Sequence, residues 1–324
     1  MGDILIYAEQ EDGEIHPVTY ELICKGRELA GKLGCKVDSV LLGSRIEEKA
    51  SELVAYGADR IFIFDHSSLH DFDLIRYSSN IVDLARETEP DIILIGATRI
   101  GRVLAPRVAA ALRTGLTADC TDLYIDEDGR LVQVRPAFSG NIMAEIKTWR
   151  KPQMATVRYK VMKMGEPDPS RKGEVIRRQV KIIEDTGMKI LEKTPAAEME
   201  INEARVIVSG GRGLRSPDEF RILEELAEIL GGVVGSSRPL VDSGWIGREH
   251  QVGFSGNIVK PKVYIACGIS GSPQHLFGMR DSEVIIAINK DPSAPIFRFS
   301  DYGVIGEVQE ILPLLIEELR RGAK

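Results

Sequence analysis

The chain has 324 residues, of which 43% are hydrophobic and 28% are charged, and its formal net charge at pH 7 is -7. This length predicts two domains, and the acidic balance argues against a nucleic-acid partner, which favours a basic face. No apolar run approaches the roughly 20 residues of a membrane span, and the start lacks a signal peptide's layout, so we expect a cytoplasmic protein. Its 4 cysteines and 5 histidines are scattered, which argues against a bound metal.

Residues 1–112 alternate four times between short apolar strands and helices. We predict strands at 4–7, 37–42, 60–64 and 92–96, and helices at 20–33, 46–56, 74–86 and 101–112. Because crossovers between parallel strands are right-handed, this order predicts a parallel sheet with helices on both faces. A hairpin of strands 123–125 and 131–134 around the turn 126–129 should add an antiparallel edge to that sheet.

Two turns in this half have no settled role. Residues 98–102 start a helix and either bind an anion or form a solvated, basic helix start, and we favour the second. Residues 135–141 form a glycine turn with an arginine.

Residues 165–200 are rich in proline, glycine and charged residues, a composition that sustains neither a helix nor a central strand. We therefore predict an amino-terminal α/β domain at 1–164, a connection at 165–200 and a second domain at 201–324.

In the second domain, three apolar strands each run into a turn of glycine and polar residues. The strands are 205–208, 263–267 and 284–288, and the turns are 209–213, 268–275 and 289–292. In an open parallel sheet such turns line the crevice at the carboxyl ends of the strands, where ligands bind. Ser216, Pro217 and Glu219 predict a capping box for a helix that ends at Leu230, and 306–321 form an amphipathic terminal helix.

Four cationic or titratable side chains lie at these strand ends, namely Arg212, Arg238, His275 and Lys290. A single loop arginine is usually surface charge, and a glycine turn before a helix is as often a tight connection as a phosphate cradle. Four such groups at one sheet edge indicate an extended, negatively charged ligand, and a dinucleotide fits. The spacing nevertheless matches neither a Gly-x-Gly-x-x-Gly fingerprint nor a P-loop.

A dense series of motifs follows in the same domain, at 209–214, 235–238, 251–253, 264–271, 274–275, 287–292, 294–297 and 301–303. In this order they closely resemble the alpha subunit of electron transfer flavoprotein. The amino-terminal half resembles that family more loosely, through 104–110 and 115–119. The resemblance implies two domains, each a mainly parallel sheet with helices on both faces, and FAD bound in a doubly wound second domain.

The same resemblance implies the partners and the site residues. The chain would form a heterodimer with a beta subunit and relay electrons between a flavin dehydrogenase, such as acyl-CoA dehydrogenase, and another carrier. Arg238 and His275 would stabilise the negative charge that the flavin gains with one electron. The residues implied to contact FAD are Arg212, Ser237, Arg238, Val252, Gly253, Phe254, Ser255, Ser270, Gly271, Ser272, Pro273, Gln274, His275, Asn289, Glu307 and Val308.

The sequence departs from the common family pattern at three of these places. Phe-Ser replaces Gln-Thr at 254–255, Ser-Pro replaces Ala-Ile at 272–273, and Glu-Val replaces Asp-Leu at 307–308. Ser255 keeps the hydroxyl group, and a proline in a first helical turn costs no hydrogen bond within the helix.

Alternatives stay open within and outside the family. Segments 114–121, 135–143 and 238–245 resemble electron-bifurcating members, whose beta subunit holds a second FAD and splits electrons from NADH within an NADH/ferredoxin system. The other possibility in the family is an ordinary respiratory carrier with AMP in the beta subunit. Outside it stand a nucleotide sensor and a free-standing nucleotide-dependent enzyme, although no catalytic acid, base or nucleophile points to the latter.

Overall fold

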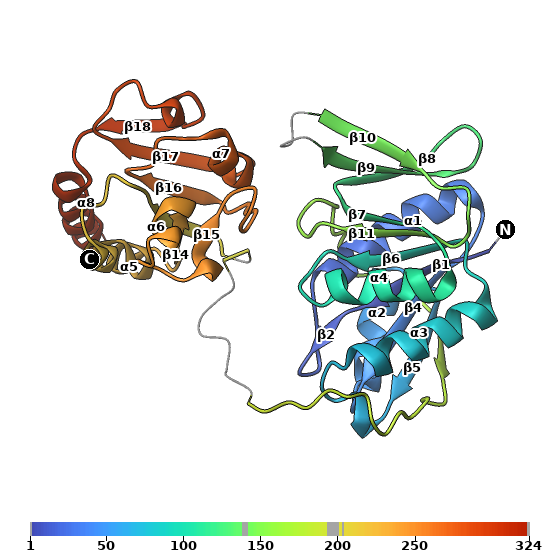
Figure 1. Ribbon diagram of the computed structural model, residues 1–324. Helices are drawn as coiled ribbons and strands as arrows, with labels where there is room; N and C mark the ends of the chain where they lie inside the picture. The colour runs from blue at the N-terminus through green and yellow to red at the C-terminus, as the bar shows by residue number, and fades with distance from the viewer. Residues whose placement is uncertain (1, 138–141, 193–200, 203, 323–324) are drawn as a thin grey trace. The chain divides into compact units, whose positions relative to one another are not determined.

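The computed structural model describes residues 2–137, 142–192, 201–202 and 204–322. The chain divides into two compact units, Met1–Ile190 and Leu191–Lys324, and each is described by itself (Figure 1). Within the described ranges, no helix is long and apolar enough to cross a membrane.

The first unit is built on a seven-stranded parallel sheet with the order β12-β5-β4-β1-β6-β11-β7. Its four long apolar strands confirm the prediction, while the sequence pattern does not predict β7, β11 or β12. In chain order, the strands are β1 (Ile4–Ala8), β4 (Val37–Gly43), β5 (Arg60–Asp65), β6 (Ile92–Gly96), β7 (Leu116–Cys120), β11 (Gln153–Val157) and β12 (Glu174–Arg177). A small hairpin of β2 (Gln10–Glu11) and β3 (Glu14–Ile15) follows β1.

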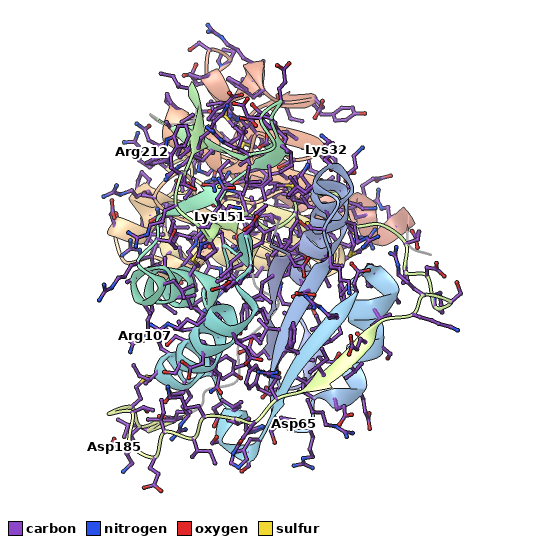
Figure 2. All side chains as sticks on the ribbon, turned by 90° about the vertical axis from the view of Figure 1, so that its right-hand side faces the viewer. Lys32, Asp65, Arg107, Lys151, Asp185 and Arg212 are labelled. Atoms are coloured by element: carbon purple, nitrogen blue, oxygen red, sulfur yellow. The ribbon has the colours of Figure 1, made fainter. Side chains whose placement is uncertain are left out.

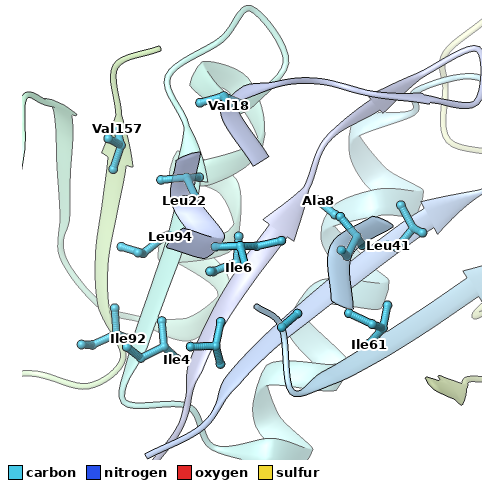
Figure 3. Packing of buried hydrophobic residues seen from close by; sticks show 14 of the residues in the cluster. Ile4, Ile6, Ala8, Val18, Leu22, Leu41, Ile61, Ile92, Leu94 and Val157 are labelled. Atoms are coloured by element: carbon cyan, nitrogen blue, oxygen red, sulfur yellow. The ribbon is translucent and has the colours of Figure 1, made fainter. Parts of the chain in front are cut away.

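Helices cover both faces of this sheet, as predicted. Buried residues of α1 (Val18–Leu33) and α2 (Ala50–Tyr56) form one core cluster, and those of α3 (Leu74–Thr88) and α4 (Gly101–Leu112) form another. Figure 3 shows Val18 and Leu22 of α1 in one cluster with Ile6 and Leu94 of the central strands. Each such apolar side chain contributes about 1.5–3 kcal/mol of hydrophobic free energy when it is fully buried.

The predicted hairpin forms, but the expectation that it extends the parallel sheet is wrong. β8 (Asp122–Ile125), β9 (Leu131–Ala137) and β10 (Ile142–Lys147) make a separate three-stranded antiparallel sheet. The reason is that β7 pairs in parallel with β11 and already forms the edge of the large sheet. The glycine turn expected at 135–141 begins within β9, and residues 138–141 lie outside the described residues.

Part of the expected connection at 165–200 packs on the first unit. β12 pairs in parallel with β5. Beyond β12, the N–H of Arg178 donates to the carbonyl of Ile63, and the N–H of Lys181 donates to Asn80 Oδ1. The first compact unit therefore extends to Ile190, and residues 193–200 lie outside the described residues.

The second unit has a six-stranded parallel sheet with the order β15-β14-β13-β16-β17-β18. Because the order runs outward from β13 in both directions, the sheet is doubly wound, as predicted, and its switch point lies between β13 and β16. The strands are β13 (Val206–Gly210), β14 (Val233–Ser237), β15 (Gln251–Val252), β16 (Val263–Cys267), β17 (Val284–Asn289) and β18 (Tyr302–Ile305).

Helices again lie on both faces of the sheet. Buried residues of α5 (Phe220–Ile229), α6 (Arg238–Asp242) and α8 (Val308–Gly322) share one core cluster. Leu276 and Met279 of α7 (Pro273–Met279) belong to the other cluster, together with Tyr264 of β16. α8 confirms the predicted terminal helix.

The capping box predicted at the start of α5 is wrong. The Ser216 side chain caps no N–H group, and Pro217–Glu219 form a 3-10 turn before the helix. Glu219 Oε2 instead accepts hydrogen bonds from the N–H of Arg215 and from Nε2 of Gln309, because α8 passes close to this turn. Gly231 follows the end of α5 in the left-handed conformation, with φ of 62°.

Glu21 on α1 makes the stability of the first unit depend on pH. Its side chain is buried, and Oε1 accepts the N–H of Lys160 at 3.1 Å. Burial raises the pKa of this carboxyl to about 7, although backbone N–H groups near Lys160 and Met162 offset part of the shift. The folded chain thus holds this proton more tightly than the unfolded chain.

We expect the free energy of unfolding to fall as pH rises from about 5 to about 7, by up to about 1.4 kcal/mol per pH unit. Glu21→Gln removes the titrating group and should flatten this slope, whereas Glu48→Gln, at an exposed glutamate, should not. Urea denaturation at pH 5.5 and pH 8 measures the difference. Equal slopes in wild type and Glu21→Gln would contradict the assignment.

Candidate functional site

A cavity of about 340 Å³ lies at the carboxyl ends of the strands in the second unit. It brings together the predicted site residues Arg212, Ser237, Ser270, Ser272, His275, Asn289, Glu307 and Val308. Its other lining residues are Gly213, Pro239, Gly268, Ile269, Lys290, Asp291 and Gly306. The cavity therefore lies where the strand and turn pattern predicts a ligand crevice.

Two glycine turns meet backbone to backbone in the cavity wall. Gly213 N donates to the carbonyl of Gly268 at 2.9 Å, and Gly211 N donates to the carbonyl of Cys267 at the same distance. A Cβ atom on Gly213 would lie 2.5 Å from the Cα of Gly268, and Gly268 has φ of 64°. Only glycine fits at these positions, and the turns leave bare backbone at the cavity wall.

The cavity offers positive charge and free amide groups to an anion. Arg212 is exposed, lines the cavity and forms no ion pair with any described residue (Figure 2). The N–H groups of Ser270 and Gly271 donate to no atom of the described residues. In a chain with net charge -7, these groups supply the local attraction that an anionic ligand needs.

A small ion-pair network lies at the opposite wall. Glu307 Oε1 is 3.3 Å from Lys290 Nζ, and Glu307 Oε2 is 3.2 Å from Arg215 Nη2. Glu307 thus bridges Lys290 and Arg215, and Arg212 is left as the lining cation without an ion pair among the described residues. Asn289 Nδ2 donates to the carbonyl of Ile269 at 2.9 Å, which ties the turn after β17 to the turn after β16.

His275 is a buried titratable group of the cavity wall. Its side chain is 5% exposed, and its Nε2 atom is 3.0 Å from the hydroxyl of Tyr264. Burial lowers the pKa of His275 to about 4, and the carbonyl of Val252 offsets a small part of that shift. At pH 7 the imidazole is therefore neutral and adds no positive charge to the cavity.

The other predicted site residues are not among those that line the cavity, namely Arg238, Val252, Gly253, Phe254, Ser255, Gly271, Pro273 and Gln274. Arg238 starts α6, and its Nε pairs with Asp242 Oδ2 at 3.1 Å on the exposed surface. The loop after β15 is held to α7, because the N–H of Phe254 donates to the carbonyl of Gln274 at 2.8 Å. Ser255 Oγ accepts from Gln251 Nε2 at 3.1 Å.

Two lining residues, Pro239 and Gly306, lie outside both the predicted turns and the implied contact residues. Neither has a side chain that by itself indicates a ligand. Each lies within two residues of a strand end or of a predicted lining residue, so the position of the strands is the signal that finds them.

The anion site considered at 98–102 in the first unit is not supported. Thr98 Oγ1 donates to Glu9 Oε2 at 2.6 Å, and Glu9 is 4% exposed. Arg102 Nε donates to the carbonyl of Ala97 at 2.9 Å. The Thr98 hydroxyl and the Arg102 guanidinium are thus both bonded within the protein, so a basic helix start is the better description.

The glycine contact can be tested by two matched substitutions. Gly231→Ala places a Cβ in open space at φ of 62°, whereas Gly268→Ala adds a clash with the backbone of Gly213 at nearly the same φ. We expect a loss of about 1–2 kcal/mol in unfolding free energy for Gly231→Ala, and about 1–3 kcal/mol more for Gly268→Ala. Urea denaturation at constant pH measures both, and equal losses would show that the turns can separate freely.

Comparison with known proteins identifies the family. The electron transfer flavoprotein domain matches residues 4–183, and the electron transfer flavoprotein FAD-binding domain matches residues 200–280. The electron transfer flavoprotein subunit alpha of Thermoanaerobacterium thermosaccharolyticum is 50% identical over 98% of this chain and 98% of its own length.

Two further relatives carry more specific names. Subunit LctC of the lactate dehydrogenase (NAD(+),ferredoxin) of Acetobacterium woodii is 45% identical over 97% of this chain and 76% of its own length. The acryloyl-CoA reductase electron transfer subunit beta of Anaerotignum propionicum is 42% identical over 99% of this chain and 96% of its own length. The chain therefore belongs to the electron transfer flavoprotein family, as a member of its alpha-subunit type.

Proposed function

We propose that this alpha subunit binds FAD in the cavity of its second unit and relays electrons between a flavin dehydrogenase and another carrier. It acts in a heterodimer with an electron transfer flavoprotein beta subunit. The observation that carries the proposal is the cavity at the switch point between β13 and β16, where glycine backbone, Arg212 and free amide groups lie together. When bound, FAD supplies the electron-carrying chemistry that protein side chains lack.

The residues of the cavity fit the parts of this cofactor. Arg212 and Ser237 would hold the pyrophosphate, because an unpaired guanidinium and a hydroxyl both donate to phosphate oxygens. Residues 270–275 would contact the flavin and its ribityl chain. Asn289, Glu307 and Val308 would hold the adenosine end, where the Glu307 carboxylate can accept hydrogen bonds from sugar hydroxyls.

Residues beside the cavity would complete the flavin end. Arg238 lies between Ser237 and Pro239, which both line the cavity, and its present partner Asp242 is on the exposed surface. A surface pair of this kind is worth at most about 1 kcal/mol, so Arg238 can exchange it for a cofactor contact. In contact with the cofactor, the charge of Arg238 would favour the negatively charged form that the cofactor takes when it is reduced.

We further infer that the heterodimer is of the electron-bifurcating type. Support comes from the relative named as a lactate dehydrogenase (NAD(+),ferredoxin) subunit and from the relative named for acryloyl-CoA reductase. Segments 114–121, 135–143 and 238–245 agree with this type. NADH and ferredoxin would then be partners of the complex, and the FAD of this chain would pass on one electron of each pair.

The first test compares two arginines that flank the two ends of strand β13. Arg212→Ala should weaken FAD binding to the heterodimer roughly tenfold to a hundredfold, because a charge-assisted hydrogen bond contributes about 1.5–3 kcal/mol. Arg205→Ala, at the amino end of β13, should leave the affinity unchanged. Quenching of flavin fluorescence measures both dissociation constants. Equal affinities for wild type and Arg212→Ala would place the phosphates elsewhere.

The second test asks what the heterodimer contains and does. If it bifurcates, the purified complex should hold two FAD molecules and oxidise NADH, with ferredoxin and a flavin-dehydrogenase substrate reduced together. The physical reason is that one flavin must split the electron pair while a second, in this chain, accepts a single electron. Flavin and nucleotide counts after denaturation provide the measurement. One FAD with one AMP, and no oxidation of NADH, would identify an ordinary carrier.

A further inference from the structure

Three buried polar groups lie in a row beside the cavity, on β13, β16 and α7. Tyr264 is completely buried, and its hydroxyl is 3.0 Å from Nε2 of His275. Ser209 is also completely buried, and its Oγ has no hydrogen-bond partner of normal geometry. Burial raises the pKa of Tyr264 far above its ordinary value, and the Ser209 hydroxyl offsets part of that rise.

The strand register explains why these side chains meet. Ile207 of β13 lies opposite Tyr264, and Ser209 lies opposite Ala266. Residues two apart on a strand point to the same face of the sheet, so Ser209 and Tyr264 are diagonal neighbours on one face. α7 covers that face and carries His275 beside Tyr264, with the two ring centroids 6.1 Å apart and the rings tilted by 60°.

The three groups can be hydrogen-bonded in two ways. In the first, the Tyr264 hydroxyl donates to Nε2 of a neutral His275, which places the ring proton on Nδ1. This atom faces the backbone of Val252 but makes no hydrogen bond of normal geometry with it. In the second, a protonated His275 donates from Nε2–H to the Tyr264 oxygen, and Tyr264 turns its O–H toward Ser209 Oγ. The second arrangement also requires a rotation of the Ser209 side chain, because its Oγ makes no hydrogen bond of normal geometry with Tyr264 in the structure.

The protein itself does not supply the charge that would favour the second arrangement. The charged groups lining the cavity are Arg212, Lys290, Asp291 and Glu307, and Tyr264 is the titratable group that contacts the imidazole. None of these charged side chains shifts the pKa of His275, which burial alone lowers. An anion in the cavity would therefore decide the protonation state of the imidazole, since a nearby opposite charge favours its charged form.

We propose that Ser209 and Tyr264 form a hydrogen-bond relay that positions His275 and lets it take up one proton at Nε2 when the bound cofactor gains negative charge. The inference rests on the proposed function, because it requires FAD in this cavity. The proton comes from solvent and bonds to the lone pair of Nε2, while Tyr264 keeps its own proton and no covalent bond of the protein breaks. Ser209 and Tyr264 are positioning residues in this arrangement.

The relay can be tested without a cofactor. In ¹⁵N NMR spectra of the full chain with labelled histidine, assigned with His275→Gln, His275 should show protonated Nδ1 and unprotonated Nε2 at pH 7. Tyr264→Phe should give a mixture of tautomers, because the donor to Nε2 is gone. Tyr7→Phe, which removes the unpartnered hydroxyl of a buried tyrosine in the first unit, should leave the signal unchanged. A protonated Nε2 in the neutral wild-type ring would overturn the relay.

The proton uptake is tested in the FAD-loaded heterodimer. Between pH 6 and 8, the potential of the first electron should fall with rising pH in the wild type, and this slope should be lost in both Tyr264→Phe and Ser209→Ala. Tyr7→Phe should keep the wild-type slope. A wild-type potential that does not change with pH overturns the proton uptake. A wild-type heterodimer that binds no FAD overturns the proposed function, which the tautomer experiment distinguishes from failure of the relay.

Discussion

The contact between two glycine turns is the constraint on which the site of the second unit depends. The hydrogen bond from Gly213 to Gly268, at 2.9 Å, holds the loop after β13 against the loop after β16. These strands are neighbours only because the chain reverses its winding direction between them. A side chain at either glycine would force the loops apart, so the close approach brings Arg212 and the amides of Ser270 and Gly271 to one place. The strand order therefore places the two glycine turns side by side, and the turns place a cation and two N–H groups in one cavity.

The first unit shows that the architecture alone does not make such a site. Its sheet also winds outward in both directions, with the switch point between β1 and β6. There the turn after β6 is closed by the bond between Thr98 and the buried carboxylate of Glu9, at 2.6 Å. A buried carboxyl group thus stands where the second unit presents Arg212 and the N–H groups of Ser270 and Gly271. Function follows from these residues and not from the shared fold.

The sequence predicts the parts of the fold whose signal is strong and local. Long apolar strands such as β1 and β16 stand out because both of their faces are buried. β15, with two residues, and β18, with four exposed residues, lack such a run and are defined by pairing with their neighbours. The capping box failed for a related reason, since Glu219 bonds to Gln309 on α8, a partner distant in the chain.

The candidate site divides in the same way between local and tertiary causes. The rule that ligands bind at the carboxyl ends of parallel strands finds Arg212, Ser270 and Asn289, because it needs only strand ends. The state of His275 follows from enclosure by Tyr264 and the surrounding core, which no spacing in the sequence reveals. Arg238 has the expected position, yet its pairing with Asp242 shows that position does not determine the contact a side chain makes.

These observations separate two tasks within one cavity. In the proposed site, Arg212 supplies a positive charge and the backbone amides supply N–H dipoles, which together can hold an anionic ligand. Glu307 forms ion pairs with Lys290 and Arg215 in the same cavity wall. His275 differs, because burial lowers its pKa and its contact with Tyr264 offers a partner for a proton on Nε2. On our proposal, ligand binding depends on the charge of Arg212 and the amide dipoles, whereas the response to added electrons depends on the buried imidazole, whose protonation costs desolvation that a nearby anion offsets.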